Sequence, residues 1–249
     1  MTRLAIFSDI HANLPAMEVV GKHILAGKYD AVYCLGDLGG YASQPNEVQE
    51  LIMSCNCPTI MGNYDEGVGF NKDDCGCLYV KPFDIEMSGI SFGWTREHTT
   101  DTNKAWLRTL PRELRLEIEG KSVLLCHGSP ASTTEYLFDF RSDAYLSKFT
   151  PGGANDAQAD VIVFGHTHVP YHRTVNGIDF VNTGSVGRPR GGDPRAGYCV
   201  LTIDGDTVSA EQVRLDYDIE LTCKRLIEAG LPHYFTEYLR TGGVVPGHS

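Results

Sequence analysis

The sequence predicts an α/β fold in which two sheets pack face to face and helices cover their outer surfaces. Three observations lead to this prediction. Short, continuously apolar runs end at glycine or a small polar residue, which is typical of strands buried on both faces. Amphipathic stretches lie between these runs in the first half of the chain. Turn residues join neighbouring runs in the second half, which indicates antiparallel hairpins.

The first half alternates strand and helix patterns. We expect strands at residues 4–7, 31–35 and 59–61, because each is an unbroken apolar or β-branched run. After the first run, apolar residues recur at helical spacing, namely Leu14, Met17, Val20 and Ile24. A shorter helical face covers residues 48–52. Residues 102–110 also read as a helix, which should stop before Pro111.

The second half is richer in antiparallel strands. Further apolar runs occupy residues 123–126 and 161–164. Three turn sequences predict hairpins, at Glu119-Gly120, Asn176-Gly177 and Asp204-Gly205-Asp206. Residues 217–240 read as amphipathic helices with a break around Gly230-Leu231-Pro232. We therefore expect a single domain over residues 1–249, with residues 217–249 forming a C-terminal helical extension.

Composition narrows the classes of function. The chain has 21 Lys and Arg against 32 Asp and Glu, a net charge of −11, so we expect no general nucleic-acid binding surface. We see neither a signal peptide nor a stretch of membrane-spanning length, and we expect a cytoplasmic protein without membrane contact. Eight cysteines then favour reduced thiols. Two CxC pairs offer a structural zinc site as an alternative, formed by Cys55, Cys57, Cys75 and Cys77.

A side chain that can bind a divalent cation follows each of the five apolar runs. Sites in layered α/β folds collect at the carboxyl ends of strands, so these side chains should converge. They are Asp9, His11, Asp37, Asn63, His127, His166 and His168. The mixture of nitrogen and oxygen donors suits divalent transition metals better than calcium. Seven ligands are too many for one tetrahedral zinc and suit two metals that share a carboxylate.

The order of these motifs resembles a known family. DxH, GD, GN, HG and GHTH follow one another between Asp9 and His168, as in the calcineurin-like metallophosphoesterases. The stretch NTGSVGRPR after them resembles the small bacterial members. The resemblance implies a four-layer α/β/β/α sandwich of two mixed sheets. It also implies a dinuclear phosphoesterase, acting on a phosphodiester, nucleotide or phosphomonoester.

The resemblance also assigns the ligands. Asp9, His11 and His168 would hold one metal. A second metal would lie on Asn63, His127 and His166, and Asp37 would bridge the two. The metals would be two divalent transition ions, and Mn, Fe, Zn, Ni and Co are all compatible with the ligands. Such a pair activates a hydroxide that attacks phosphorus in line with the leaving group, without a covalent enzyme intermediate.

One position departs from the family pattern. Many members have histidine after the GN asparagine, whereas this chain has Tyr64. A phenol with a pKa near ~10 can donate a hydrogen bond at neutral pH but supplies no imidazolium charge. We include Tyr64 with Asp37, Asn63 and Asp65 as candidate catalytic residues. Asp65 is either a partner that orients the site or a solvated turn carboxylate.

Three further residues are candidates for substrate binding. Arg188 and Arg190 follow the last motif, and arginine suits a phosphate group. The alternative is that both are solvated loop residues. Asn13 follows the DxH motif and can either contact a substrate oxygen or cap the next helix.

Other classes of function remain open at the sequence level. The chain could be a metal-free scaffold on the same fold, although it retains all seven ligands. A nuclease is another alternative, but it would need a basic groove that this acidic chain lacks. The oligomeric state is open.

Overall fold

The structure is a computed structural model, and it describes residues 1–247. In chain order the elements are β1 (Thr2–Phe7), α1 (Leu14–Ala26), β2 (Ala31–Cys34), α2 (Pro45–Ser54), α3 (Asn63–Gly69), α4 (Pro82–His98), α5 (Asp101–Leu107), β3 (Glu113–Ile118), β4 (Lys121–Cys126), α6 (Asp143–Leu146), the 3-10 turn η1 (Ser147–Phe149), β5 (Val161–Phe164), β6 (Tyr171–Val175), β7 (Ile178–Asn182), β8 (Ala196–Asp204), β9 (Thr207–Leu215), α7 (Ile219–Glu228) and α8 (His233–Arg240).

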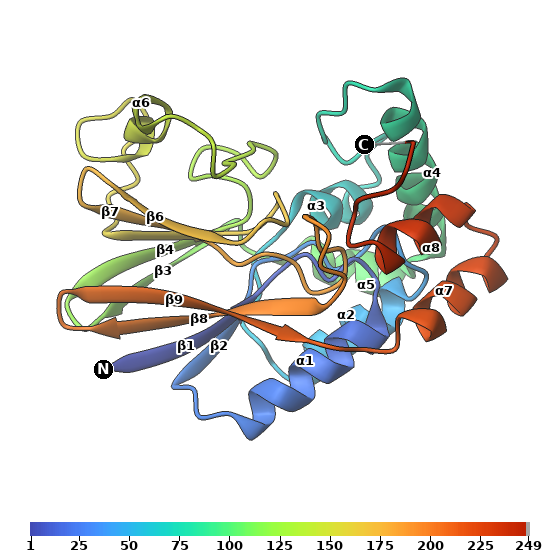
Figure 1. Cartoon of the computed structure of the whole chain (residues 1–249), viewed down its shortest axis with the longest axis horizontal. Helices are drawn as coiled ribbons and strands as arrows, with labels where there is room; N and C mark the ends of the chain where they lie inside the picture. Colours follow the sequence, from blue (N-terminus) through green and yellow to red (C-terminus); the bar gives the residue numbers. More distant parts are fainter. Residues whose placement is uncertain (248–249) are drawn as a thin grey trace.

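These strands form two mixed sheets that stack on each other (Figure 1). The first has the order β2-β1-β8-β9, with β1 and β2 parallel and the other neighbours antiparallel. The second has the order β3-β4-β5-β7-β6, and its three central strands are parallel. The carboxyl ends of the parallel strands therefore share an edge within each sheet, as a converging site requires.

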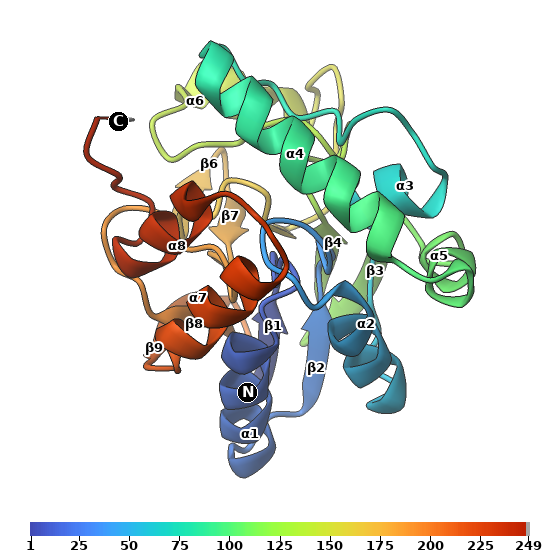
Figure 2. The same cartoon turned by 90° about the vertical axis from the view of Figure 1, so that its right-hand side faces the viewer.

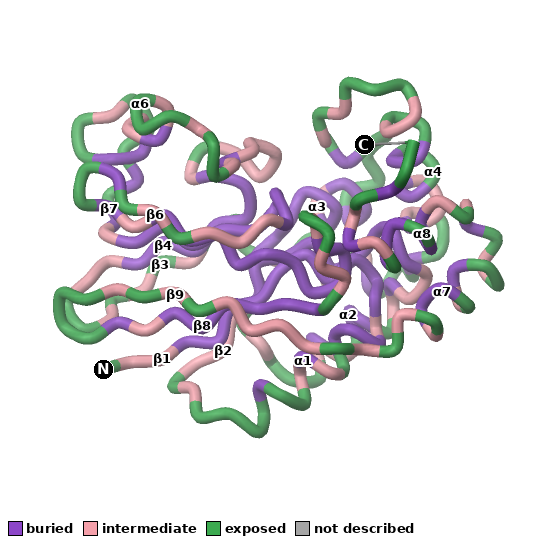
Figure 3. Tube along the Cα trace, in the orientation of Figure 1, coloured by how far each residue is buried: buried purple, intermediate pink, exposed green. Residues whose placement is uncertain are grey.

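The core lies in three layers. The inner layer joins the two sheets through apolar side chains such as Ile6, Val163 and Leu201. A second layer lies between the first sheet and helices α1, α2, α7 and α8, and a third covers the outer face of the second sheet. Figure 3 shows the buried trace concentrated where the sheets meet, with the hairpin turns exposed. The predicted arrangement of sheets and flanking helices is thus confirmed.

The two outer faces differ in what covers them. Figure 2 shows α1, α2, α7 and α8 on the side of the first sheet and α4 crossing above them. The outer face of the second sheet is covered mainly by the loop from β4 to β5, which contains α6 and η1. Leu137, Leu146 and Phe149 of this segment are completely buried. A loop therefore buries the outer face of the second sheet, whereas helices bury that of the first.

Most local predictions hold, with two corrections. The three hairpins and the helix break at 230–232 appear as expected, and the predicted helix at 102–110 corresponds to α5. The expected strand at 59–61 is wrong, because only Thr59 forms a bridge, to Cys34, before the chain turns into α3. Helix α4 was not predicted, because glycine and serine interrupt its apolar pattern.

Two other properties concern surfaces. No helix within residues 1–247 is both long enough and apolar enough to span a bilayer. The structure has an apolar cavity of about 530 Å³ between α1 and α2, lined by residues such as Met17, Leu25 and Leu51. It does not include any of the predicted metal ligands.

Candidate metal centre

Six of the seven predicted ligands lie just after the carboxyl ends of strands from both sheets, and the seventh begins a helix. Asp9 and His11 follow β1, and Asp37 follows β2. Across the interface, His127 follows β4, and His166 and His168 follow β5. Asn63 is the first residue of α3. All seven are buried, none with more than 6% of its surface exposed. The stacking of the sheets thus brings together residues that are up to 159 positions apart in the sequence.

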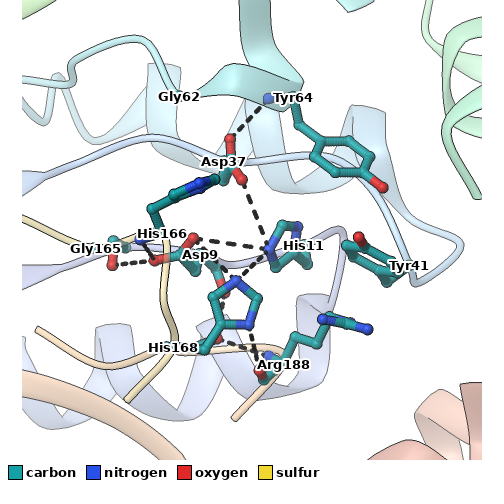
Figure 4. A network of polar contacts seen from close by, with 12 residues as sticks. Asp9, His11, Asp37, Tyr41, Gly62, Tyr64, Gly165, His166, His168 and Arg188 are labelled. Carbon is teal, nitrogen blue, oxygen red and sulfur yellow. Dashed lines mark hydrogen bonds and ion pairs between the residues drawn. The ribbon is translucent and has the colours of Figure 1, made fainter. Parts of the chain in front are cut away.

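Two groups of three ligands are each compact enough to hold a cation. In one group, donor atoms of Asp9, His11 and His168 all lie within 4.8 Å of one another. In the other, those of Asp37, His127 and His166 meet the same limit. Figure 4 shows the side chains of five of these residues directed toward a common centre. The groups resemble the two ligand sets expected from the sequence, except that Asp37 takes its place in the second group.

Asp37 is positioned between the two groups. Its Oδ2 lies 3.4 Å from His127 Nε2 and 3.8 Å from His11 Nε2. Its other oxygen, Oδ1, accepts a hydrogen bond of 2.9 Å from the Tyr64 amide. Asn63 joins the second group, because its Oδ1 lies 3.1 Å from His127 Nε2. One carboxylate oxygen is therefore near ligands of both groups, as a bridging role requires.

Backbone carbonyls fix the orientation of three histidine rings. Nδ1 of His11 lies 2.8 Å from Gly39 O, that of His127 lies 2.7 Å from Leu35 O, and that of His168 lies 2.7 Å from Arg188 O. A carbonyl only accepts, so each Nδ1 carries hydrogen and donates. In the neutral ring, Nε2 then presents a lone pair. This is the tautomer and orientation that a metal-binding histidine needs.

These tautomers make the site unfavourable without a cation or a proton. His11 Nε2 and His168 Nε2 are only 3.0 Å apart, although both are acceptors in neutral rings. The Asn63 amide nitrogen donates to Cys75 O at 2.9 Å, so its Oδ1 faces His127 Nε2, which can donate only while His127 holds a second proton and presents a lone pair once that proton has left. Lone pairs that face each other repel, and a positive charge between them removes the repulsion. The donor set therefore fits metal ions.

Two buried atoms support the same conclusion. Asp9 Oδ1 and His166 Nε2 have no hydrogen-bond partner within the described part of the chain. Leaving a buried polar atom unpaired costs ~1–3 kcal/mol and more for a charged group, so such atoms call for an explanation. Both belong to the ligand groups described above. Coordination of a cation would satisfy both.

Burial and neighbouring charges set the protonation of the site. Burial lowers the pKa of His11 to about 3, with the nearby His168 acting in the same direction. Burial likewise lowers the pKa of His166 to about 3, helped by His127. At His127 burial alone would lower the pKa, but the carboxylates of Asp37 and Asp9 raise it to about 10. Two neutral imidazoles thus stand beside one that holds a proton until a metal displaces it.

The backbone at the ligands has an uncommon conformation. Asp9, His11, Asp37, His166 and His168 all have positive φ, between 49° and 63°. This left-handed region is sparsely populated by residues other than glycine, although Asp and His are among those that enter it more readily. Residues of this kind cluster at functional sites, where the surrounding structure holds them. The turns after the strands therefore fix the ligand positions.

The glycines in the motifs permit close approach of these turns. A Cβ at Gly62 would lie 2.2 Å from Asp37 Oδ1, and one at Gly165 would lie 2.5 Å from Asp9 Oδ2. Both distances are far below van der Waals contact. Gly62 before Asn63 and Gly165 before His166 are thus needed because any larger residue would collide with the carboxylate of another motif.

Asp65 orients the turn that carries Asp37. Its carboxylate accepts hydrogen bonds from the amides of Asp37, Leu38 and Gly62, at 2.7, 2.9 and 2.9 Å. Burial and the charge of Asp37 raise the pKa of Asp65 to about 7, and the amide donors oppose this rise. The residue is 1% exposed. Of the two sequence-level alternatives, the structure fits the orienting partner and not the solvated turn.

The predicted substrate-binding residues lie in different environments. Asn13 caps α1 and uses its amide inside the protein, accepting from Ala16 N and Thr222 Oγ1 and donating to Gly187 O and Tyr217. It is completely buried and does not line the cavity at the metal ligands. The capping alternative therefore describes its place in the structure.

Arg188 and Arg190 do line that cavity. The Arg188 guanidinium lies between the rings of Tyr41 and Tyr238, 3.7 and 4.0 Å from their centroids, with 8% of the residue exposed. Within residues 1–247 it makes no ion pair, which leaves its charge available to an anion. Figure 4 shows it beside Tyr41 and near His168.

Tyrosines form most of the remaining wall. We call Tyr41, Tyr64, Tyr79 and Tyr136 the aromatic rim, since all four line the cavity beside the ligands. Tyr64 is 1% exposed and its ring packs edge-on against His11 with centroids 5.4 Å apart. Its hydroxyl lies 3.4 Å from Ser91 Oγ. Sequence reasoning identified only Tyr64, because the others come from loops whose sequences have no motif.

Cys77 was not assigned to this site from the sequence. Its Sγ accepts a hydrogen bond from Asn63 Nδ2 at 3.2 Å and it lines the cavity. The other CxC pair, Cys55 and Cys57, lines the apolar cavity between α1 and α2. The two pairs do not converge on a metal-binding group within the described residues. None of the eight cysteines forms a disulfide bond.

Fold and site together define a class, namely an α/β protein of two stacked mixed sheets with a buried cluster of candidate cation ligands at one edge of both sheets. The family model described as the calcineurin-like phosphoesterase superfamily domain matches residues 2–206, and the chain belongs to this superfamily. The resemblance noted in the motifs is therefore confirmed. Candidate metal ligands and the family together support binding of divalent metal ions.

Similar proteins cover nearly the whole chain. An uncharacterized protein of Methanocaldococcus jannaschii is 32% identical over 257 residues, which span 96% of this chain and 98% of that protein. The crystal structure of a metallophosphoesterase from Sphaerobacter thermophilus is 28% identical, with a TM-score of 0.74 over 97% of this chain and 99% of that one. A hypothetical protein from Pyrococcus horikoshii shares the fold, with a TM-score of 0.82, 20% identity and coverage of 98% and 99%.

Proposed function

We propose that the protein is a phosphoesterase that uses two divalent transition metal ions to hydrolyse a phosphodiester, nucleotide or phosphomonoester. The observation that carries the proposal is the pair of ligand groups with Asp37 between them. Asp9, His11 and His168 would hold one ion, and Asn63, His127 and His166 the other. When bound, such ions supply an activated water and neutralise charge on the phosphoryl group.

The chain's own residues would do the remaining work. Asp37 would contact both metal ions and so keep the two ligand groups at a fixed separation. Asp65 fixes the turn that carries Asp37 by accepting hydrogen bonds from three backbone amides. Arg188, buried and without a carboxylate partner in residues 1–247, would bind phosphate oxygens as a preorganised cation. The aromatic rim would exclude water from one side of the phosphate. Tyr64 would face the leaving oxygen as a neutral hydrogen-bond donor.

The proposal extends to the organisation of the chain. Residues 1–249 would form one domain with residues 217–249 as a C-terminal helical extension, of which 248–249 lie outside the described residues. Thr222 of α7 bonds to Asn13, and Phe235 of α8 contacts the ring of Tyr41 at 6.0 Å between centroids. The extension therefore supports the metal centre. A cytoplasmic location is also part of the proposal, and it is consistent with eight cysteines that form no disulfide bonds.

The test combines metal content with activity. Chelator-treated protein should take up close to two ions per chain from Mn, Fe, Co, Ni or Zn, measured by elemental analysis and titration. Hydrolysis of a phosphodiester and a phosphomonoester panel should appear only after reconstitution. Uptake of a single ion would overturn the dinuclear reading. Protein without bound metal or hydrolysis would favour the scaffold alternative, and degradation of single-stranded DNA would favour the nuclease.

A further inference from the structure

A second cavity adjoins the metal centre. It has a volume of about 260 Å³ and shares three lining residues with the cavity at the ligands, namely Tyr79, Tyr136 and Arg190. One wall comes from the segment before α4 and the other from the loop after β4. The volume is close to the lower end of small-molecule pockets, about 300–1,000 Å³. A group bonded to a phosphate at the ligands could extend directly into this space.

The loop after β4 presents a row of stacked rings along this cavity. Tyr136 lies over the metal ligand His166, with centroids 4.1 Å apart. Phe138 stacks on Tyr136 at 5.4 Å with a 10° angle between the rings, and Phe140 stacks on Phe138 at 5.0 Å and 11°. Leu137 points into the core and is completely buried. Tyr136 and Phe138 thus lie on the side of the segment opposite Leu137, and a turn at residues 139–140 brings the ring of Phe140 onto Phe138.

The row leads from the metal centre to solvent. Phe140 is 75% exposed, and across the cavity Leu78 and Val80 are 78% and 92% exposed. Exposed apolar residues gathered at one opening mark a surface that binds something apolar. Only Tyr136 and Phe138 of the row line the cavity, whereas Phe140 does not. Because each of those two rings has a neighbouring ring on both sides, it offers the cavity its edge and the offset part of its face, against which another flat ring can pack edge-to-face or offset.

Polar groups at the same cavity favour a heteroaromatic ring attached to phosphate. Arg190 lines both cavities and makes no ion pair or side-chain hydrogen bond within residues 1–247. Its charge therefore suits an anion at the boundary. Lys81 and Asp84 line the second cavity and provide a donor and an acceptor. Nitrogen atoms at a ring edge can pair with both, whereas a plain benzene ring cannot.

We propose that the cavity between residues 78–84 and 136–138 binds the base of a nucleotide whose phosphate lies at the metal ligands. This inference rests on the proposed function and specifies its substrate class. Stacking on an aromatic side chain contributes ~1–3 kcal/mol per base, equivalent to about fivefold to a hundredfold in affinity. The base would pack against the edges and offset faces that Phe138 and Tyr136 present to the cavity, and Arg190 would lie beside its phosphate.

Binding to the whole, metal-free chain tests the subsite without relying on catalysis. Isothermal titration calorimetry compares AMP with ribose 5-phosphate, which carry the same sugar and phosphate and differ in the base. We expect AMP to bind about fivefold to a hundredfold more tightly to the wild-type protein. Phe138→Ala should abolish most of this preference and leave the affinity for ribose 5-phosphate unchanged. Phe138→Tyr should retain the preference, because it keeps the ring.

Phe140→Ala is the matched control, since it removes the same ring two residues beyond the cavity. It should keep the preference for AMP. Equal affinity of the two ligands in the wild-type protein, survival of the preference in Phe138→Ala, or equal loss in both alanine variants would overturn the proposal. Phenyl phosphate tests whether any ring attached to phosphate is enough for binding. Tighter binding of phenyl phosphate than of AMP also contradicts a base site.

The same proteins separate this inference from the proposed function. After metal reconstitution, hydrolysis of a small dialkyl phosphate that has no ring tests the metal centre alone. Absence of hydrolysis together with a Phe138-dependent preference for AMP would remove the proposed function and leave the base subsite. Metal-dependent hydrolysis without any preference for AMP would do the reverse.

Discussion

The floor and the wall of the metal centre are built in different ways. The floor consists of the seven candidate ligands, which are all buried, and backbone carbonyls orient three of their histidine rings. The wall consists of the aromatic rim and two arginines, which come mostly from loops and touch one another through rings. The floor suits cations and the wall suits the organic part of a substrate. The difference predicts that some substitutions will change substrate choice without changing metal content.

The largest effect should come from the floor. Asp37→Asn removes the charge between the two ligand groups, so both metals should bind more weakly. We expect kcat/KM to fall by roughly 10²–10³-fold or more, the scale on which loss of a main electrostatic stabiliser acts. Elemental analysis of the purified variant should show less than the wild-type metal content.

The matched control is Asp206→Asn, the same chemical change on an exposed hairpin turn. It should leave metal content and kcat/KM unchanged. If Asp37→Asn retains full metal and activity, Asp37 does not bridge the two ions, and the distinction between floor and wall loses its basis.

A change in the wall should leave metal content intact. Tyr64→His places an ionisable imidazole where Tyr64 lines the cavity. General-acid assistance is typically worth ~10²–10⁴ in rate, and a leaving alkoxide needs it more than an aryloxide. We expect Tyr64→His to raise kcat/KM for an alkyl phosphate ester more than for an aryl ester of the same phosphate, at matched metal occupancy.

Tyr64→Phe is the control for this substitution, because it keeps the ring and removes the hydroxyl. It should slow the alkyl ester more than the aryl ester. If Tyr64→His changes the hydrolysis of the two esters equally, or only changes metal content, Tyr64 does not lie near the leaving oxygen.

The floor itself should respond unequally to pH. The pKa of His127 is raised to about 10 in the metal-free protein, so metal binding at neutral pH must expel its proton. Affinity for the ion at His127 should therefore rise about tenfold per pH unit up to a pH near this pKa. Burial keeps the pKa of His11 at about 3, and no proton leaves His11 near neutral pH.

Calorimetry in buffers of different ionisation enthalpy measures the protons released per ion. One ion should release about one proton more than the other between pH 6 and 8. Equal release at both sites would mean that the carboxylates do not hold a proton on His127.

The smallest effect should come from the cysteines beside the floor. Cys75→Ser should leave two metals per chain and shift the melting temperature by little, because Cys75 is a buried thiol that belongs to neither group of candidate metal ligands. Differential scanning calorimetry and elemental analysis check this. Cys55→Ser is an exposed control. Loss of a third metal and a large drop in melting temperature would restore the structural zinc alternative.

The sequence allowed prediction of the floor because each ligand follows a run that is apolar for a physical reason. Buried strands such as β1 and β5 need continuous apolar residues, and their ends converge when the strands are parallel. Glycine before Asn63 and His166 is also visible in the sequence, although its cause, a carboxylate from another motif, is not. Local pattern and long-range packing agree at these positions.

The wall could not be predicted in the same way. Tyr79 and Tyr136 lie in loops, and their approach depends on how the two sheets and α4 are placed relative to one another. Helix α4 itself has glycines at 89 and 93, which weaken any helical pattern. Asn13 illustrates a different difficulty: its place in the sequence was noticed, but asparagine is equally suited to capping a helix and to contacting a substrate. Only its partners, Thr222 and Tyr217, decide between them.

The distribution of the ligands along the chain has a consequence for biosynthesis. Asp9 and His11 leave the ribosome long before His168, and β1 pairs with β8, which ends at residue 204. A nascent chain that carries only the first three ligands lacks the opposite sheet and one neighbour of β1. Domains generally fold as units during synthesis. Metal loading should therefore follow translation of more than four-fifths of the chain. The protein would then bind whichever divalent ions are available around it after most of the chain has been synthesised.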